Sequence, residues 1–263
     1  MSVRPEETGL DSLPPKLPNG VILEKPPFVP QLVLTPQLQA VMRDVMHQWK
    51  HREKFASLIQ YGIRPLDRLL FYGPPGNGKT MACYWMSRKL EIPIYRVLCN
   101  QLHSKYCAET THNVADVMDY LNRRVKPAIV LWDEVEAIFT DRKSGQSATH
   151  QELGAALTVF LQSLDRWKAP ILLVMATNLR EHLDDALLSR IEMQIQFTGP
   201  DVDQCESMLQ YWGEILCDHG SEEWAPVLRE RMREQPAESF RHLQQMIAYA
   251  AREWIARKCG EPK

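Results

Sequence analysis

Residues 71–80 read FYGPPGNGKT, and this stretch decides what the rest of the chain can be. Gly73 to Thr80 fits the spacing G-x-x-x-x-G-K-[ST]. The stretch follows an apolar run, RLLFY (68–72), and leads into a segment with helical spacing that begins at Lys79. Glycines let successive backbone N–H groups turn toward one anion, and a helix N-terminus adds the positive end of its dipole. Between a strand and a helix, the spacing predicts a phosphate-binding loop rather than a surface turn.

The residues of this loop have separate expected roles. Lys79 is expected to neutralise the charge of the β- and γ-phosphates, and Thr80 to offer its hydroxyl to Mg²⁺. The predicted cofactors are therefore ATP and Mg²⁺. The residues expected to surround the nucleotide are Gly73, Pro74, Pro75, Gly76, Asn77, Gly78, Lys79, Thr80 and Met81.

A pair of acidic residues follows an apolar run further along the chain. The segment AIVLWDEVE (128–136) predicts a buried strand that ends in Asp133 and Glu134. The carboxyl end of such a strand lies at the same edge of a parallel sheet as the phosphate-binding loop. Asp133 is then expected to hold Mg²⁺ through water, and Glu134 to orient or deprotonate the attacking water. This pair favours hydrolysis over nucleotide storage.

Composition limits the classes of protein that the chain can belong to. Its 263 residues are 44% hydrophobic and 24% charged, which is ordinary for a soluble globular protein. The net charge of −2 provides no general attraction to nucleic acid, although a local basic face stays possible. The six cysteines form no C-x-x-C pair, and the N-terminus carries no apolar segment typical of a leader. We therefore expect a cytoplasmic protein without a membrane partner.

Strand and helix patterns alternate along most of the chain. Apolar runs predict strands near 68–72, 92–98, 128–132, 171–176 and 193–197, and helical patterns separate them. This rhythm predicts an α/β fold of the P-loop NTPase type, an αβα sandwich with a parallel sheet. After residue 199 the strand pattern stops and helical spacing continues. The predicted domains are a proline-rich extended arm (1–35), a nucleotide-binding core (36–198) and a small α-helical lid (199–263).

Taken together, these motifs resemble those of AAA+ ATPases. VMATN (174–178) is similar to the family's sensor 1, which implies that Asn178 positions the attacking water. LDDALLSRIEMQIQF (183–197) is similar to the second region of homology of the AAA subgroup. At its arginine-finger position stands Arg190, implied to reach the γ-phosphate of a neighbouring subunit. ESFRHLQQM (238–246) resembles sensor 2 and implies that Arg241 contacts nucleotide from the lid.

The segment SKYCAETTHNV (104–114) narrows the resemblance further. Protein-remodelling members such as spastin, katanin and FtsH-type unfoldases carry an aromatic pore loop at this place. The resemblance implies that Lys105, Tyr106 and Cys107 form a substrate pore loop in which the aromatic ring grips an extended polypeptide. An aromatic ring suits that task because it contacts any sequence through area. The alternative is a loop tyrosine packed against its own domain.

The resemblance implies a homo-oligomeric ring, expected to be a hexamer, that remodels, unfolds or translocates a polypeptide. A separately encoded partner, such as a protease, would fit a chain without a substrate-selecting domain. Two other functions stay open: a nucleic-acid-associated AAA+ factor, such as a loader or transposition regulator, and an adaptor switched by nucleotide. The sequence favours nucleic acid less than polypeptide.

Overall fold

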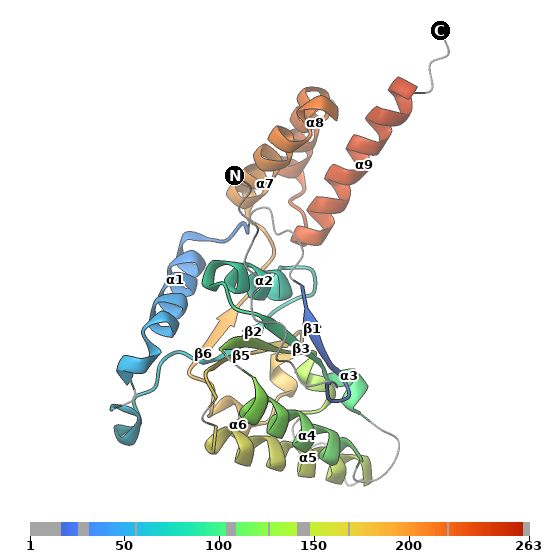
Figure 1. The fold of residues 1–263 in the computed structure, drawn as a ribbon. Helices are drawn as coiled ribbons and strands as arrows, with labels where there is room; N and C mark the ends of the chain where they lie inside the picture. The colour runs from blue at the N-terminus through green and yellow to red at the C-terminus, as the bar shows by residue number, and fades with distance from the viewer. Residues whose placement is uncertain are drawn as a thin grey trace, which may run out of the picture.

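The computed structural model describes residues 17–25, 32–55, 57–103, 109–125, 127–140, 148–167, 169–219 and 221–259. Helices cover both faces of a central sheet, and three further helices form a group beside it (Figure 1). The strands are β1 (Val21–Glu24), β2 (Arg68–Tyr72), β3 (Ile94–Leu98), β4 (Ala128–Asp133), β5 (Ile171–Thr177) and β6 (Met193–Gln196). The α-helices are α1 (Pro36–Lys50), α2 (Lys79–Leu90), α3 (Cys99–Leu102), α4 (Glu109–Arg124), α5 (Ala148–Asp165), α6 (Asp185–Leu188), α7 (Val202–Ile215), α8 (Ser221–Glu234) and α9 (Phe240–Cys259). Short 3₁₀ turns are η2 (Arg52–Phe55), η3 (Ile59–Tyr61), η4 (Val135–Ala137), η6 (Arg180–His182) and η7 (Cys217–His219).

The strand order across the described part of the sheet is β1-β3-β4-β5-β2-β6. The neighbours from β3 to β6 all pair in parallel, and β1 alone pairs antiparallel, with β3. The α/β sandwich with a parallel sheet that the sequence predicts is therefore confirmed. The strand β1 is an addition to that prediction: four residues within the proline-rich segment join the sheet at its edge. An edge strand needs a ladder on one side only, so nearby prolines do not exclude it.

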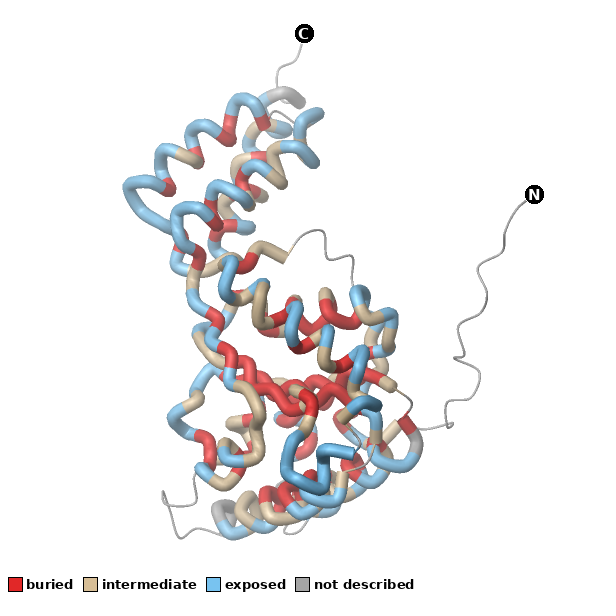
Figure 2. Tube along the Cα trace, turned by 90° about the vertical axis from the view of Figure 1, so that its left-hand side faces the viewer, coloured by how far each residue is buried: buried red, intermediate tan, exposed pale blue. Residues whose placement is uncertain are grey.

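Apolar side chains cover both faces of the sheet, and the central strands between them are buried (red in Figure 2). On one face α4 and α5 pack over Val130 and Trp132, and on the other α1 and α2 pack over Leu131 and Phe71. Consecutive residues of β4 thus belong to different clusters, as expected for a strand buried on both faces. This double burial fixes the register of the central strands, because a slip by one residue would exchange the two faces.

Local signals define where the first helix begins. The hydroxyl of Thr35 accepts a hydrogen bond from the backbone N–H of Leu38 at 3.2 Å, and Pro36 occupies the first turn of α1. This cap satisfies one of the amide groups that a helix start leaves unpaired. The helix then buries Met42, Val45 and Trp49 against the sheet.

Helices α7, α8 and α9 have an apolar cluster of their own, which includes Leu209, Leu228 and Leu243. Helix α7 begins with a capping box, in which Asp201 and Gln204 each bind the backbone N–H of the other. Within the described residues, no helix is both long and apolar enough to cross a bilayer.

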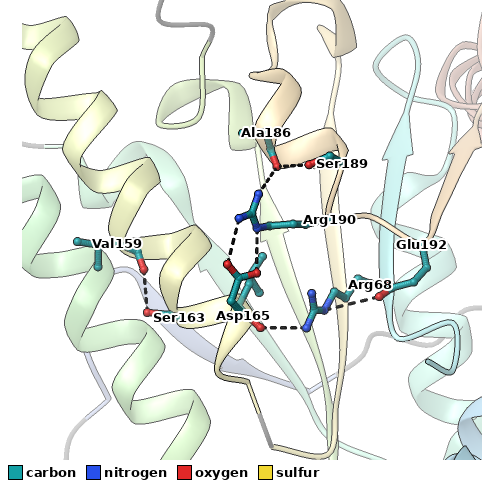
Figure 3. A network of polar contacts seen from close by, with 9 residues as sticks. Arg68, Val159, Ser163, Asp165, Ala186, Ser189, Arg190 and Glu192 are labelled. Carbon is teal, nitrogen blue, oxygen red and sulfur yellow. Dashed lines mark hydrogen bonds and ion pairs between the residues drawn. The ribbon is translucent and has the colours of Figure 1, made fainter. Parts of the chain in front are cut away.

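Buried charges gather at the amino ends of β2 and β6. The Arg68 guanidinium donates to the Leu164 carbonyl at 2.9 Å, and its Nε lies 3.8 Å from Glu192 (Figure 3). The same Nε lies 4.0 Å from Asp67. Burial raises the pKa of Asp67 to about 6 and, together with the charge of Asp67, raises the pKa of Glu192 to about 7. One arginine therefore faces two carboxyl groups that are costly to ionise in this place.

We predict that the free energy of unfolding falls as the pH rises from about 4 to about 7. Both pKa values lie above those of an unfolded chain, so unfolding in this range releases protons and higher pH favours the unfolded state. Glu192→Gln should flatten the fall by about 2 kcal/mol. Denaturant unfolding at a series of pH values measures this, with Glu230→Gln as the control for losing an exposed carboxylate. An equal slope in wild type and Glu192→Gln would contradict the prediction.

Candidate nucleotide-binding site

The candidate site lies at the carboxyl edge of the sheet, where three parallel strands end together. The register places Tyr72 of β2 opposite Thr177 of β5, and Asp133 of β4 opposite Ala176. The residues that follow β2, β4 and β5 therefore lie close together at this edge of the sheet. The phosphate-binding loop, the acidic pair and Asn178 all line a single cavity of about 490 Å³.

Backbone conformation in the loop between β2 and α2 depends on glycine. Gly76 has φ of 82° and Gly78 has φ of 90°, values that favour glycine over residues with a side chain. A Cβ atom at Gly76 would lie 3.0 Å from Cβ of Arg241 and 3.2 Å from Oγ of Ser239. The Gly76 carbonyl accepts a hydrogen bond from the Arg241 N–H at 3.1 Å. The loop is therefore in direct contact with the start of α9.

The Lys79 ammonium group joins the loop to the neighbouring strand. It donates to the carbonyl oxygens of Gly73 at 2.6 Å and Pro74 at 3.1 Å, and to Oδ1 of Asn178 at 2.8 Å. Burial lowers its pKa, against the opposing effects of Asp133 and Glu136. All three acceptors lie on the walls of the cavity or beside it, so the amine is positioned where a bound phosphate would meet it.

The residues that line the cavity fit a nucleoside triphosphate with Mg²⁺. Asn77 is 3% exposed, and both polar atoms of its side chain are buried without a hydrogen-bond partner among the described residues. A buried amide left in this way is expected where a ligand completes its bonds. Thr80 and Asp133 line the same cavity with the oxygen donors that Mg²⁺ prefers.

The acidic pair has distinct surroundings. Oδ2 of Asp133 accepts from Arg96, at 2.6 Å from Nη2 and 3.1 Å from Nε. Glu134 is exposed and has φ of 58°, a left-handed conformation that a residue with a side chain seldom adopts. Such conformations gather at functional sites, and this one follows directly after the strand that carries Asp133.

The amide group of Asn178 is fixed from two sides. Its side-chain oxygen accepts from Lys79, and its backbone N–H donates to Oε1 of Glu136 at 3.2 Å. Glu136 follows the acidic pair in η4. The structure therefore brings Asn178, Lys79 and the acidic segment together, as the sequence predicts.

One part of the cavity wall was not predicted. It consists mainly of aromatic and apolar side chains from three segments that are distant in the sequence. Its members are Leu32, Val33, Met208, Tyr211, Trp212, Phe240 and Gln244. Such a surface suits a nucleobase, because base and aromatic ring bury flat apolar area against one another. Phe240 and Gln244 belong to the stretch that resembles sensor 2 (238–246), but no motif marks the other members; the approach of α7 and α9 to residues 32–33 assembles them.

The two candidate arginines occupy different places. Arg241 of α9 lines the cavity beside Gly76. Arg190 lies just before β6, at the amino edge of the sheet and away from the cavity. There its Nε and Nη2 bind the two carboxylate oxygens of Asp165 at 2.9 and 3.0 Å, and its Nη1 donates to the Ala186 carbonyl at 3.0 Å (Figure 3). The Asp165 contact holds the pKa of Arg190 above its usual value, and in turn lowers the pKa of Asp165.

The predicted pore-loop residues Lys105, Tyr106 and Cys107 lie outside the described residues. Their role stays a prediction. The helix that follows them, α4, begins at Glu109.

A glycine-rich loop between strand β2 and helix α2, an acidic pair at the end of β4 and a parallel sheet define a P-loop NTPase. Residues 69–198 match the family model of the ATPase family associated with various cellular activities (AAA). The chain is thus an AAA+ ATPase, and the resemblance inferred from its motifs is confirmed at this level.

Curated relatives agree with this assignment. The chain is 31% identical over 202 residues to a probable 26S proteasome regulatory subunit 6B of Caenorhabditis elegans, covering 73% of this chain and 48% of that protein. It is 36% identical over 146 residues to the 26S proteasome regulatory subunit 6B homolog of Dictyostelium discoideum, covering 54% and 36%. An uncharacterized AAA family ATPase of Sinorhizobium fredii is 31% identical over 142 residues, covering 54% and 42%. The chain spans about half or less of the length of these relatives.

We predict that Trp212→Ala weakens adenine nucleotide binding by about three- to tenfold, the value of one lost aromatic contact. Trp212 lies on the wall assigned to the base and is not among the hydrogen-bond partners of the loop lysine in the described structure. Titration with a fluorescent ATP analogue measures the Kd. Tyr249→Ala, at an exposed position on α9, is the matched control. Equal affinity in Trp212→Ala and wild type would remove this wall from the site.

Proposed function

We propose that the chain is one subunit of a ring that hydrolyses ATP to remodel, unfold or translocate a polypeptide. The observation that carries the proposal is the separation of Arg190 from the cavity, since it leaves a candidate catalytic arginine at the far edge of the sheet. The regulatory subunits of the 26S proteasome among the relatives support a polypeptide substrate. A separately encoded partner such as a protease, and a cytoplasmic location, belong to the same proposal.

Within one subunit, the chain's residues divide the work of phosphoryl transfer. Lys79 and the loop amides would bind the β- and γ-phosphates, with Thr80 and Asp133 as the residues that would hold Mg²⁺. When bound, the metal ion supplies positive charge that offsets charge developing on the phosphates. Glu134 would take the proton of the attacking water, while Asn178, held by Glu136, would orient that water.

The remaining charge compensation would come from a neighbour. Strands β2 and β6 run parallel, so the loop after β2 and the arginine before β6 lie at opposite edges. The Arg190 side chain cannot reach from one edge of its own sheet to the other. In a ring of subunits arranged head to tail, however, the edge of one subunit that carries Arg190 would face the edge of the next subunit that carries the phosphate-binding loop. Arg190 would then complete the site of the adjacent subunit. The proposed division into core (36–198) and lid (199–263) places each cavity between the two parts.

Arg190→Ala should bind ATP normally and lose about 10³-fold in turnover, as with fingers supplied in trans. Lys79→Ala should also be inactive, because a subunit without Lys79 cannot bind the phosphates in its own nucleotide site. Mixing the two variants should restore part of the activity, since intact Arg190 from one subunit then completes the intact site of the other. Turnover of each variant and of the mixture is the measurement.

Arg229→Ala is the matched control, because Arg229 forms a similarly exposed ion pair with Glu206 at 2.6 Å. It should leave turnover unchanged. Two inactive variants that gain nothing on mixing, or an Arg190→Ala protein at wild-type rate, would contradict the finger in trans.

The substrate class is tested by trapping. Glu134→Gln should bind ATP and stall before hydrolysis, because the side chain can no longer accept the proton of water. Captured from lysate with ATP, it should retain a defined set of proteins that resist nuclease and are lost from a Glu134→Gln, Tyr106→Ala double variant. Retention of nucleic acid, or loss of the proteins on nuclease treatment, would instead support a nucleic-acid-associated factor. Tyr106→Ala alone should keep basal ATP hydrolysis.

A further inference from the structure

A series of polar contacts runs from the edge strand β1 to Asp133. The guanidinium of Arg96, on β3, forms its centre: two of its nitrogens bind Oδ2 of Asp133 at 2.6 and 3.1 Å, and Nη1 binds Oε1 of Glu24 at 3.2 Å. The side chains of Glu24 and Asp133 are 17% and 15% exposed, and that of Arg96 is 30% exposed. Water therefore screens these contacts less than it screens surface ion pairs.

The outer end of the series is held by the helix of the nucleotide site. The Tyr84 hydroxyl of α2 donates to Oε2 of Glu24, so both oxygens of this carboxylate are engaged. Helix α2 begins with Lys79 and Thr80. Glu24 is thus bound by the helix that follows the phosphate loop and by the strand next to the acidic strand. Arg96 itself lines the nucleotide cavity.

We propose that Arg96 is a positioning residue for the Mg²⁺ carboxylate Asp133, and that Glu24 of β1 limits how strongly Arg96 opposes the metal ion. The edge strand would thereby tune the Mg²⁺ dependence of nucleotide binding. The inference rests on the proposed role of Asp133, and the experiment below separates the two.

The geometry gives Arg96 two opposing effects. Both of its contacts to Asp133 use Oδ2, which orients the carboxylate and leaves Oδ1 outside these two contacts, and Asp133 lines the cavity. Its positive charge, however, lies where a divalent cation has to approach. Glu24 balances part of that charge and draws the guanidinium toward β1. An aspartate that binds a metal ion through water tolerates some change of orientation without losing affinity for the ion. The charge of Arg96 therefore governs the Mg²⁺ affinity, and its contacts to Oδ2 govern turnover.

These two effects predict that Glu24→Gln and Arg96→Gln shift the Mg²⁺ dependence of nucleotide binding in opposite directions. Glu24→Gln leaves Arg96 with one anionic partner, and should raise the Mg²⁺ concentration needed for half-maximal binding of a non-hydrolysable ATP analogue by about three- to tenfold. Arg96→Gln removes the competing charge and should lower that concentration by a similar factor. Its turnover should nevertheless fall at least about tenfold, because Asp133 loses its orientation. Arg96→Lys keeps the charge without the forked contact, so its Mg²⁺ dependence should stay near wild type while turnover falls.

The measurement is a fluorescence titration of the nucleotide analogue at a series of Mg²⁺ concentrations, which needs no hydrolysis. Arg123→Gln is the control for loss of a paired arginine, because Arg123 binds Asp119 at 2.6 Å on the exposed side of α4. A general loss of structure would weaken nucleotide binding at every Mg²⁺ concentration and move both variants in one direction. Arg96→Lys guards against an Arg96→Gln protein that does not fold.

Asp133→Asn separates the inference from its premise. If Asp133→Asn leaves the Mg²⁺ dependence unchanged, the proposed metal role of Asp133 fails and the inference fails with it. If Asp133→Asn shifts that dependence, but Glu24→Gln matches the control or shifts in the same direction as Arg96→Gln, the inference alone is overturned. Opposite shifts in the two variants support it.

Discussion

The parallel pairing of β4, β5 and β2 is the constraint on which the site depends. Three strands paired in one direction end at one edge, so the residues that follow them meet although they are far apart in the chain. The hydrogen bonds of Lys79 to the loop carbonyls and to Asn178 then tie the end of β2 to the end of β5. Burial on both faces holds this register, since each strand contributes to two apolar clusters. The packing of the sheet therefore also determines where the side chains of the nucleotide site lie.

The features that the sequence predicted well are those encoded by neighbouring residues. The strand at 68–72, the glycine loop and the acidic pair each need only local spacing and known geometry. The aromatic and apolar part of the cavity wall could not be predicted, because Trp212 and Val33 carry no shared pattern and line one cavity only through the placement of α7. The Glu24–Arg96 contact was missed for the same reason. Its two partners are joined by strand pairing between segments distant in the chain.

The opposite edge of the sheet has a different character. There Arg68 and Arg190 face carboxylates from three segments, and burial makes two of these carboxyl groups hard to ionise. Asp165 lies at the end of α5, so the orientation of Arg190 depends on how that helix packs. In the proposed ring this edge would meet the nucleotide cavity of the next subunit. Any change in the packing of α5 would then affect the nucleotide site of the next subunit rather than the site of the subunit in which the change occurs.

The position of β1 has consequences beyond its small size. It covers the edge of β3, whose backbone would otherwise offer unpaired N–H and C=O groups to another chain. The same four residues carry Glu24, whose partner Arg96 is bound to Asp133. Displacing β1 would therefore do two things at once: open a pairing edge and release a cation beside the acidic strand. Because the strand precedes α1 and lies outside the motifs that define the family, it is a place where the arm can influence an otherwise standard nucleotide site.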